Sequence, residues 1–104
     1  MQQREIWWSN LPAPVGRRPV LLVSRNEAYR VRASITVAIV SRTIRNIPAE
    51  VALGPADGMP KDCVVNCDTI ITIPKAHLES RVCTLTAGKW NQVVAAIKFA
   101  LDLP

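Results

Sequence analysis

Hydrophobic residues along this chain are gathered in short runs, and most of these runs have the character of β-strands. Each run is rich in valine and isoleucine, and Pro, Gly, Asn or Asp separates it from the next. This is typical of short strands joined by turns. The pattern predicts six strands: Arg4 to Ser9, Pro19 to Ser24, Ser34 to Ser41, Ala49 to Leu53, Cys63 to Ile73 and Arg81 to Leu85.

The C-terminal segment departs from this pattern, because its apolar residues recur at helical spacing. Thr86 precedes them and is of a residue type that caps helix N-termini. A single helical turn is also predicted over Pro74 to Leu78. The 104 residues therefore predict one mainly β domain, residues 1–104, built as a small, strongly bent antiparallel barrel with a C-terminal helix over one end. The residues at helical spacing are Trp90, Val93, Val94, Ile97 and Leu101.

The stretch VGRRPVLLVS, residues 15 to 24, places Arg17 and Arg18 directly before a proline and a nearly unbroken apolar run. Proline disfavours helical backbone for the residue before it, so Arg18 is held extended. Pro19 fits the first position of a strand, where its missing N–H costs no ladder bond. We therefore expect a guanidinium at a rigid strand entrance, either as a solvated cap or as part of a binding site.

Charge is distributed unevenly along the chain, whose net charge is +5. Residues 1 to 52 contain eight arginines and three carboxylates, whereas residues 53 to 104 contain five cations and five anions. The planar fork of arginine matches phosphate oxygens, so the excess points to a polyanion as partner. No apolar stretch approaches the roughly 18 to 20 residues that a membrane span requires. The N-terminus lacks the form of a secretory signal, so a cytoplasmic protein is expected.

The residue inventory excludes many kinds of catalytic site. A single histidine, His77, rules out an imidazole pair within one chain, and the carboxylates form no cluster that would hold two magnesium ions. Cys63, Cys67 and Cys83 are an odd number, which argues against a disulfide framework, and their spacing fits no common zinc site. No phosphate-binding glycine loop is present. We expect no metal and no cofactor, so an enzyme acting on phosphate would depend on arginine.

Two polar features interrupt the predicted strands. In VVNCDTIITI, residues 64 to 73, Asn66 and Asp68 are two residues apart, so their side chains point to one face about 6.5 to 7 Å apart. Ser41 ends the run ITVAIVS and is followed by Arg42, and a hydroxyl beside a guanidinium suits a phosphate contact. Both features also fit ordinary roles, as an exposed strand face and as turn residues.

Three stretches together resemble the MazF/PemK/Kid family of toxin endoribonucleases: REIWWSNLP, VGRRPVLLVS and IPAEVALGPADGMPKDCVVNCDTIITIPKAHL, in this order and spacing. The resemblance runs from about Arg4 to the terminal helix. It implies an SH3-like barrel of the PemK/MazF/CcdB kind, a homodimer, and cleavage of single-stranded RNA without a metal. It also implies neutralisation by a small acidic-tailed MazE-like antitoxin, with operator DNA contacted only through the antitoxin complex.

The resemblance further implies the site residues. The family's active-site pair, the arginine of the R-P strand and a threonine at the end of the next strand, falls on Arg18 and Ser41, where serine keeps the hydroxyl. Its later polar pair falls on Asn66 and Asp68. We expect the ribose 2′-hydroxyl to attack the adjacent phosphate, giving a 2′,3′-cyclic phosphate and a 5′-hydroxyl end. Arg18 would stabilise the developing charge, Ser41 would donate to a phosphate oxygen, and Asp68 would orient the RNA or accept a proton. The expected RNA contacts are Trp8, Asn10, Arg17, Arg42 and Asn66.

Two other functional classes stay open. A gyrase-poisoning toxin can share this barrel without using Arg18 or the face formed by Asn66 and Asp68. A non-catalytic SH3-like module would bind nucleic acid without cleaving it.

Overall fold

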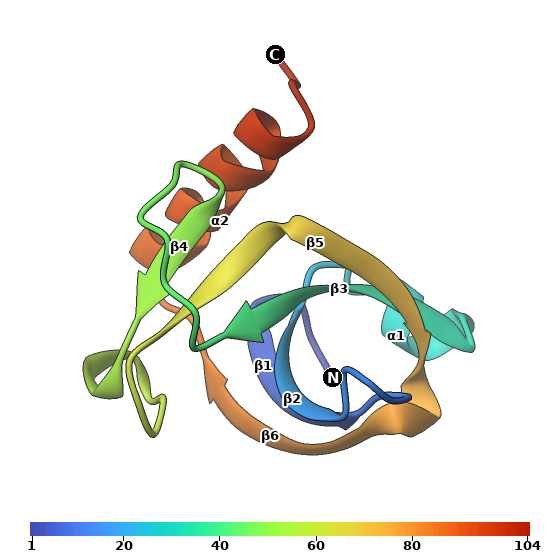
Figure 1. Cartoon of the computed structure of the whole chain (residues 1–104). Helices are drawn as coiled ribbons and strands as arrows, with labels where there is room; N and C mark the ends of the chain where they lie inside the picture. Colours follow the sequence, from blue (N-terminus) through green and yellow to red (C-terminus); the bar gives the residue numbers. More distant parts are fainter.

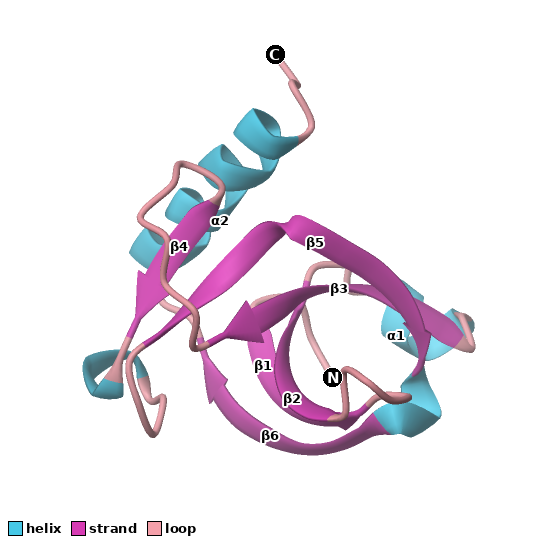
Figure 2. Cartoon of the chain, in the orientation of Figure 1, coloured by secondary structure: helices cyan, strands magenta, loops and turns pink.

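The computed structural model describes residues 1–104 and consists of six strands, two α-helices and two single 3-10 turns (Figures 1 and 2). In chain order they are β1 (Glu5–Asn10), β2 (Arg17–Leu22), α1 (Ala28–Val31), β3 (Ser34–Ser41), β4 (Glu50–Leu53), η1 (Pro55–Asp57), β5 (Cys63–Pro74), η2 (Lys75–His77), β6 (Leu78–Thr84) and α2 (Ala87–Ala100).

The six strands form one antiparallel sheet in the order β4-β5-β3-β2-β1-β6. The sheet curls on itself, and the second half of β5 and β6 close the ring around β1, β2 and β3 (Figure 1). The bend in β5 has a local cause: Ile39 pairs with Asn66 but Ala38 pairs with Ile70, so residues 67–69 bulge out of the ladder. A bulge bends its strand and increases its twist. The first half of β5 can therefore pair with β4 while its second half turns into the barrel.

Both faces of the central strands are buried, which explains their nearly continuous apolar sequence. Leu21 and Ala38 belong to a core of 13 buried residues that also includes Val93 of α2. Val20 and Val37, one residue earlier on each strand, belong to a second core of eight residues. Since neighbouring residues of a strand point to opposite faces, the stretches that lie between the two cores, residues 20–22 and 37–40, are apolar at every position.

All six predicted strands are present, and the prediction for Ser34–Ser41 has the observed bounds. The predicted terminal helix is confirmed as α2, with the Thr86 hydroxyl accepting a hydrogen bond from the Lys89 N–H at 3.2 Å. The predicted turn between the last two strands is confirmed as η2. The short elements α1 and η1 were not predicted.

Two strand starts were predicted wrongly by two residues or more, and other boundaries also differ by one or two residues. The last strand was expected to begin at Arg81, but β6 begins at Leu78. This segment lies at the edge of the sheet and pairs only with β1, so its exposed polar residues give it the pattern of a loop. Pro19 was expected to open its strand, but β2 begins at Arg17, because Arg17 already pairs with Asn10 of β1. Pairing with β3 starts only at Val20, so the proline lies where β2 has one partner.

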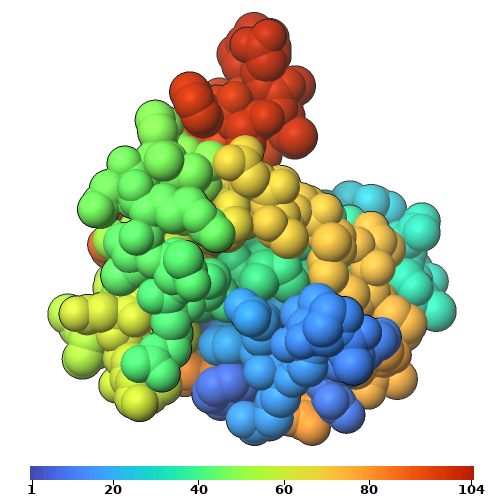
Figure 3. All heavy atoms as spheres, viewed as in Figure 1, coloured from blue at the N-terminus to red at the C-terminus, as the bar shows by residue number.

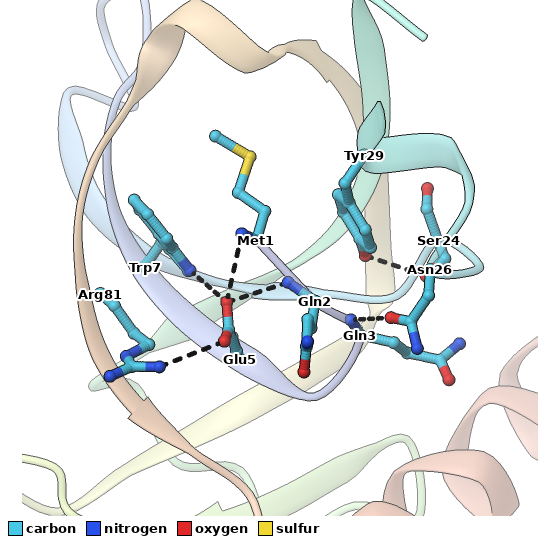
Figure 4. A network of polar contacts seen from close by, with 9 residues as sticks. All are labelled: Met1, Gln2, Gln3, Glu5, Trp7, Ser24, Asn26, Tyr29 and Arg81. Carbon is cyan, nitrogen blue, oxygen red and sulfur yellow. Dashed lines mark hydrogen bonds and ion pairs between the residues drawn. The ribbon is translucent and has the colours of Figure 1, made fainter. Parts of the chain in front are cut away.

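A buried carboxylate anchors the start of β1 (Figure 4). Glu5 accepts hydrogen bonds from the Trp7 indole and the Gln2 N–H, both at 2.9 Å, and from Arg81 of β6 at 3.3 Å. The amino group of Met1 lies 3.9 Å away. Burial by itself would raise the pKa of Glu5, but these hydrogen bonds and the nearby positive charges outweigh it, so the pKa is lowered. Glu5 therefore stays ionised and ties β1 to β6.

Helix α2 packs against β4 and β5, and its C-terminal end stands away from the rest of the molecule (Figure 3). Phe99, Leu101 and Leu103 there are each more than half exposed. None of the helices is both long enough and apolar enough to cross a membrane.

Candidate active site

The ends of three neighbouring strands meet on one side of the barrel and line a pocket of about 460 Å³. Because the strands are antiparallel, the start of β2, the end of β3 and the start of β5 come together there. The segments around residues 15–19, 40–43 and 59–63 adjoin on the face shown in Figure 3. The lining residues are Trp8, Val15, Arg17, Arg18, Pro19, Val40, Ser41, Arg42, Thr43, Met59, Pro60, Lys61 and Cys63.

Arg18 enters this pocket from a firmly held piece of backbone. Its carbonyl accepts a hydrogen bond from the fully buried Ser9 hydroxyl at 2.8 Å, and its Nε donates to the Val15 carbonyl at 3.4 Å. The turn before it is completed by Gly16, whose φ of +71° favours glycine. The terminal nitrogens of the Arg18 guanidinium have no partner in the protein, so they are free to donate to an anion.

Ser41 lies opposite Arg18 when the β2–β3 register is extended. Val20 pairs with Ile39, and two residues further along this antiparallel ladder bring Arg18 and Ser41 together on one face. The Ser41 Oγ accepts the Thr43 N–H at 3.1 Å. This bond occupies one of the oxygen's lone pairs and leaves the hydroxyl hydrogen available to donate. The predicted pair of Arg18 and Ser41 therefore lines a single pocket.

Of the predicted RNA contacts, three also line the pocket. Trp8 is half-buried at its wall, Arg17 lies over the Trp8 ring with its guanidinium carbon 4.2 Å from the ring centroid, and Arg42 is exposed at the rim. Asn10 does not line the pocket; it is an exposed residue at the end of β1, paired with Arg17.

Asn66 and Asp68 lie further along β5, outside the pocket lining. Ser41 pairs with Val64, so Asn66 is one repeat, about 6.5 to 7 Å, farther along the same face. Asp68 belongs to the bulge of residues 67–69, where its N–H donates to the Asn66 side-chain oxygen at 2.9 Å. The structure thus places Asn66 two residues beyond the partner of Ser41 and Asp68 in the bulge, both outside the pocket lining; the role of Asp68 stays a prediction.

Sequence reasoning missed Lys61 as a pocket residue. It follows Pro60 in the GMPKD stretch that carries part of the family resemblance, and this was the only available signal. With Lys61, four cationic side chains line the pocket, and the lining contains no carboxylate and no imidazole. Such a site attracts an anion and offers donors in place of a general base. Burial, followed by nearby negative charges, raises the pKa of the lining thiol Cys63, so it is not a ready nucleophile.

No group of three or more His, Cys, Asp or Glu side chains in the structure is arranged to hold a metal ion. The cysteines are all free: Cys63 and Cys67 are buried and Cys83 is partly buried. The pocket can therefore bind a polyanion through guanidinium, ammonium and hydroxyl groups, with an indole beside them.

Comparison of the sequence with known proteins identifies the family of this chain. The model of the PemK-like, MazF-like toxins of type II toxin-antitoxin systems matches residues 2–101. The chain is 35% identical over 100 residues to the probable endoribonuclease MazF5 of Mycobacterium tuberculosis, covering 94% of this chain and 90% of that protein. It is 36% identical over 89 residues to the endoribonuclease MazF1 of Mycobacterium bovis, covering 86% of this chain and 83% of that protein.

Solved structures agree with this comparison. The Mycobacterium tuberculosis toxin MazF-mt6 superposes with a TM-score of 0.89 at 31% identity, covering 97% of this chain and 99% of that chain. A mycobacterial endoribonuclease in complex with its cognate antitoxin also gives 0.89 at 31% identity, covering 100% of this chain and 97% of that chain. The family match spans nearly the whole chain, so the chain belongs to the PemK-like, MazF-like toxins of type II toxin-antitoxin systems.

Proposed function

We propose that this chain is a toxin endoribonuclease that cleaves single-stranded RNA without a metal ion, in the pocket formed by the ends of β2, β3 and β5. Two observations support RNA cleavage: the family match and the relatives named as endoribonucleases. The observation that carries the assignment to this site is that Arg18 and Ser41 line a pocket with three further cations and no carboxylate.

The reaction that suits these groups is transfer of the phosphate to the neighbouring ribose hydroxyl. The 2′-oxygen forms a bond to phosphorus, the bond from phosphorus to the 5′-oxygen breaks, and the proton lost from the 2′-hydroxyl is balanced by one gained at the leaving 5′-oxygen. Because the nucleophile is part of the substrate, the protein needs mainly to orient the chain and stabilise charge. The products are a 2′,3′-cyclic phosphate and a 5′-hydroxyl end.

Arg18 and Ser41 divide the stabilisation of the phosphorane between them. The Arg18 guanidinium keeps its charge at any relevant pH, so it serves as a permanent donor and a poor base. The Ser41 hydroxyl, whose oxygen already accepts the Thr43 N–H, donates its own hydrogen to a phosphate oxygen. Both donors lie on strand ends whose partners hold them in place, which keeps the cost of ordering them low.

The rest of the pocket binds the RNA on either side of the cleaved bond. Arg17, Arg42 and Lys61 contact backbone phosphates, and Trp8 provides an aromatic surface for a base. Asn10, which pairs with Arg17, and Asn66, which pairs with Ile39 two residues before Ser41, contact the RNA next to the pocket. Asp68 stays a candidate for orienting RNA at a second position.

The partners follow from the family. A similar mycobacterial endoribonuclease was solved in complex with its cognate antitoxin, which supports a small antitoxin as the partner of this chain. A second copy of the chain is the other proposed partner. The exposed apolar side chains Phe99, Leu101 and Leu103 at the end of α2 offer a surface for such contacts.

The experiment incubates the purified chain with a long single-stranded RNA in EDTA and maps the product ends. The proposal predicts cuts at recurrent sequences, with 5′-hydroxyl ends that a polynucleotide kinase labels directly. An RNA carrying a 2′-deoxyribose at a mapped cut site must resist cleavage there. Retention of intact RNA would identify a binding module instead, and an absence of both binding and cleavage would favour a gyrase poison.

A further inference from the structure

Three side chains from neighbouring strands form a layered contact at the rim of the pocket. Arg17 of β2 extends over the Trp8 ring of β1, with its guanidinium carbon 4.2 Å from the ring centroid. It then reaches Glu79 of β6, where its Nε donates to the carboxylate at 2.9 Å. The arginine therefore crosses a whole strand and is held from both sides, by the indole below it and the carboxylate beyond it.

The position of Glu79 is set by an irregularity in the sheet. Trp8 pairs with Ser80 and Ser9 pairs with Leu78, so Glu79 is the extra residue of a bulge in β6. A bulge re-aims the side chain that it carries, and bulges are frequent beside active sites. The carboxylate of Glu79 is consequently directed toward Arg17, which is 62 residues away in the sequence.

The geometry of the contact leaves the useful part of the arginine free. Glu79 takes the Nε hydrogen, and the two terminal nitrogens of Arg17 have no protein partner. Those nitrogens form the fork that binds a phosphate through two hydrogen bonds. The Arg17 side chain is 54% exposed, so without these contacts it would sample many rotamers, and binding RNA would have to order it.

We propose that Glu79 is a positioning residue for RNA binding: by holding Arg17 flat on Trp8, it presents the arginine's outer fork to a backbone phosphate of the strand in the pocket. The inference rests on the proposed function. The carboxylate also repels phosphate, so its charge and its hydrogen bond act in opposite directions. A glutamine at this position keeps an oxygen to accept the Nε hydrogen and loses the charge, whereas an alanine loses both.

The test compares Glu79→Ala with Glu79→Gln, because the two variants have the same net charge. Single-turnover cleavage of a single-stranded transcript gives the RNA concentration for half-maximal rate and the maximal rate, and binding of a fluorescein-labelled 2′-O-methyl RNA of mixed sequence gives the affinity. We expect Glu79→Gln to bind at least as tightly as the unmodified chain. Glu79→Ala should bind roughly 3- to 10-fold more weakly than Glu79→Gln, the cost of ordering one long side chain, with a maximal rate unchanged within twofold.

Two controls make the comparison specific. Glu27→Ala and Glu27→Gln remove an exposed carboxylate on the loop before α1 that has no ion pair, so they must bind RNA equally well. In an Arg17→Ala background, the difference between the two Glu79 variants must disappear.

Equal binding by Glu79→Ala and Glu79→Gln would overturn the inference, and so would tighter binding by Glu79→Ala, since the carboxylate would then be a competitor that RNA displaces. Failure of the unmodified chain to bind or cleave RNA would instead refute the proposed function. The two failures are therefore distinguishable.

Discussion

The clearest chemical prediction concerns the Ser41 hydroxyl, which has two separable contacts. Its oxygen accepts the Thr43 N–H at 3.1 Å, and its hydrogen is free to donate into the pocket. Ser41→Ala removes both. The lost bond to Thr43 is exposed to water, so it should cost little stability. Losing the donor to the phosphorane should cost much more in rate. The phosphorane is negatively charged, and bound RNA leaves no room for a water molecule to replace the hydroxyl.

A hydrogen bond to a charged group contributes about 1.5 to 3 kcal/mol. If Ser41 makes this bond mainly in the transition state, Ser41→Ala lowers the single-turnover rate at saturating RNA by about 10- to 150-fold. The RNA concentration for half-maximal rate should stay within about threefold of the unmodified chain, since the cations that bind the substrate are intact.

Ser41→Thr is the matched control, because it keeps the hydroxyl and should retain the rate within about threefold. Urea unfolding of both variants checks that the fold is intact. A Ser41→Ala rate within threefold of the unmodified chain would refute the reasoning, since the hydroxyl would then have no part in stabilising the phosphate.

Three further predictions concern the stability of the fold around the site and the reactivity of a buried thiol. Glu5→Ala leaves buried donors without an acceptor and should cost about 1 to 3 kcal/mol of unfolding free energy at pH 7. Because the folded-state pKa of Glu5 is lowered, this stabilisation is complete above its ordinary value of 4.5 and is lost as the pH falls through the folded-state pKa, so urea titrations of variant and parent should converge in acid. Gly58→Ala combines a φ of +95° with a new methyl 2.8 Å from the Cys83 Cβ and should cost about 2 to 5 kcal/mol. Burial and then the Asp68 charge raise the pKa of Cys67 to about 11, so iodoacetamide at pH 7.5 should label it at least about tenfold more slowly in the native chain than in urea.

Each of these predictions has its own contradicting result. Equal stability of the Glu5 variant and the parent at pH 7 would show that the carboxylate network contributes nothing. Gly16→Ala is the control for Gly58→Ala, since it has a φ of +71° with no atom within 4 Å of the new methyl, and a loss as large as that at Gly58 would refute the role of the close contact. Equal labelling of Cys67 in the native and unfolded chains would mean that its site is open to solvent.

Strands that are buried on both faces could be predicted from the sequence, because a nearly continuous apolar run is a local signal. Ser34–Ser41 is the clearest case, with residues in two cores. The sequence predicted less well where structure depends on distant partners. The first residues of β6, Leu78 to Ser80, are polar or partly exposed and become a strand only because β1, about 70 residues earlier, pairs with them.

The same distinction applies to the site. Local patterns singled out Arg18 and Ser41, the family resemblance paired them as an active site, and strand register brings them to one pocket. Lys61 and Glu79 were missed, because their positions depend on a loop conformation and on a bulge that no local pattern announces. Asp68 was assigned to the site through the resemblance alone, and its place in a bulge outside the pocket lining depends on a register shift in the β3–β5 ladder that no local pattern predicts.

The measurement that tests the central claim most directly is the single-turnover rate of RNA cleavage by Arg18→Ala at saturating RNA, in EDTA, with the fold checked by urea unfolding. If Arg18 stabilises the phosphorane from its position opposite Ser41, the rate falls by about 10² to 10³ or more, by analogy with the loss of an oxyanion donor. Arg18→Lys, which keeps the charge without the planar fork, should recover only part of that loss. A folded Arg18→Ala chain that cleaves RNA within threefold of the parent rate would contradict the account.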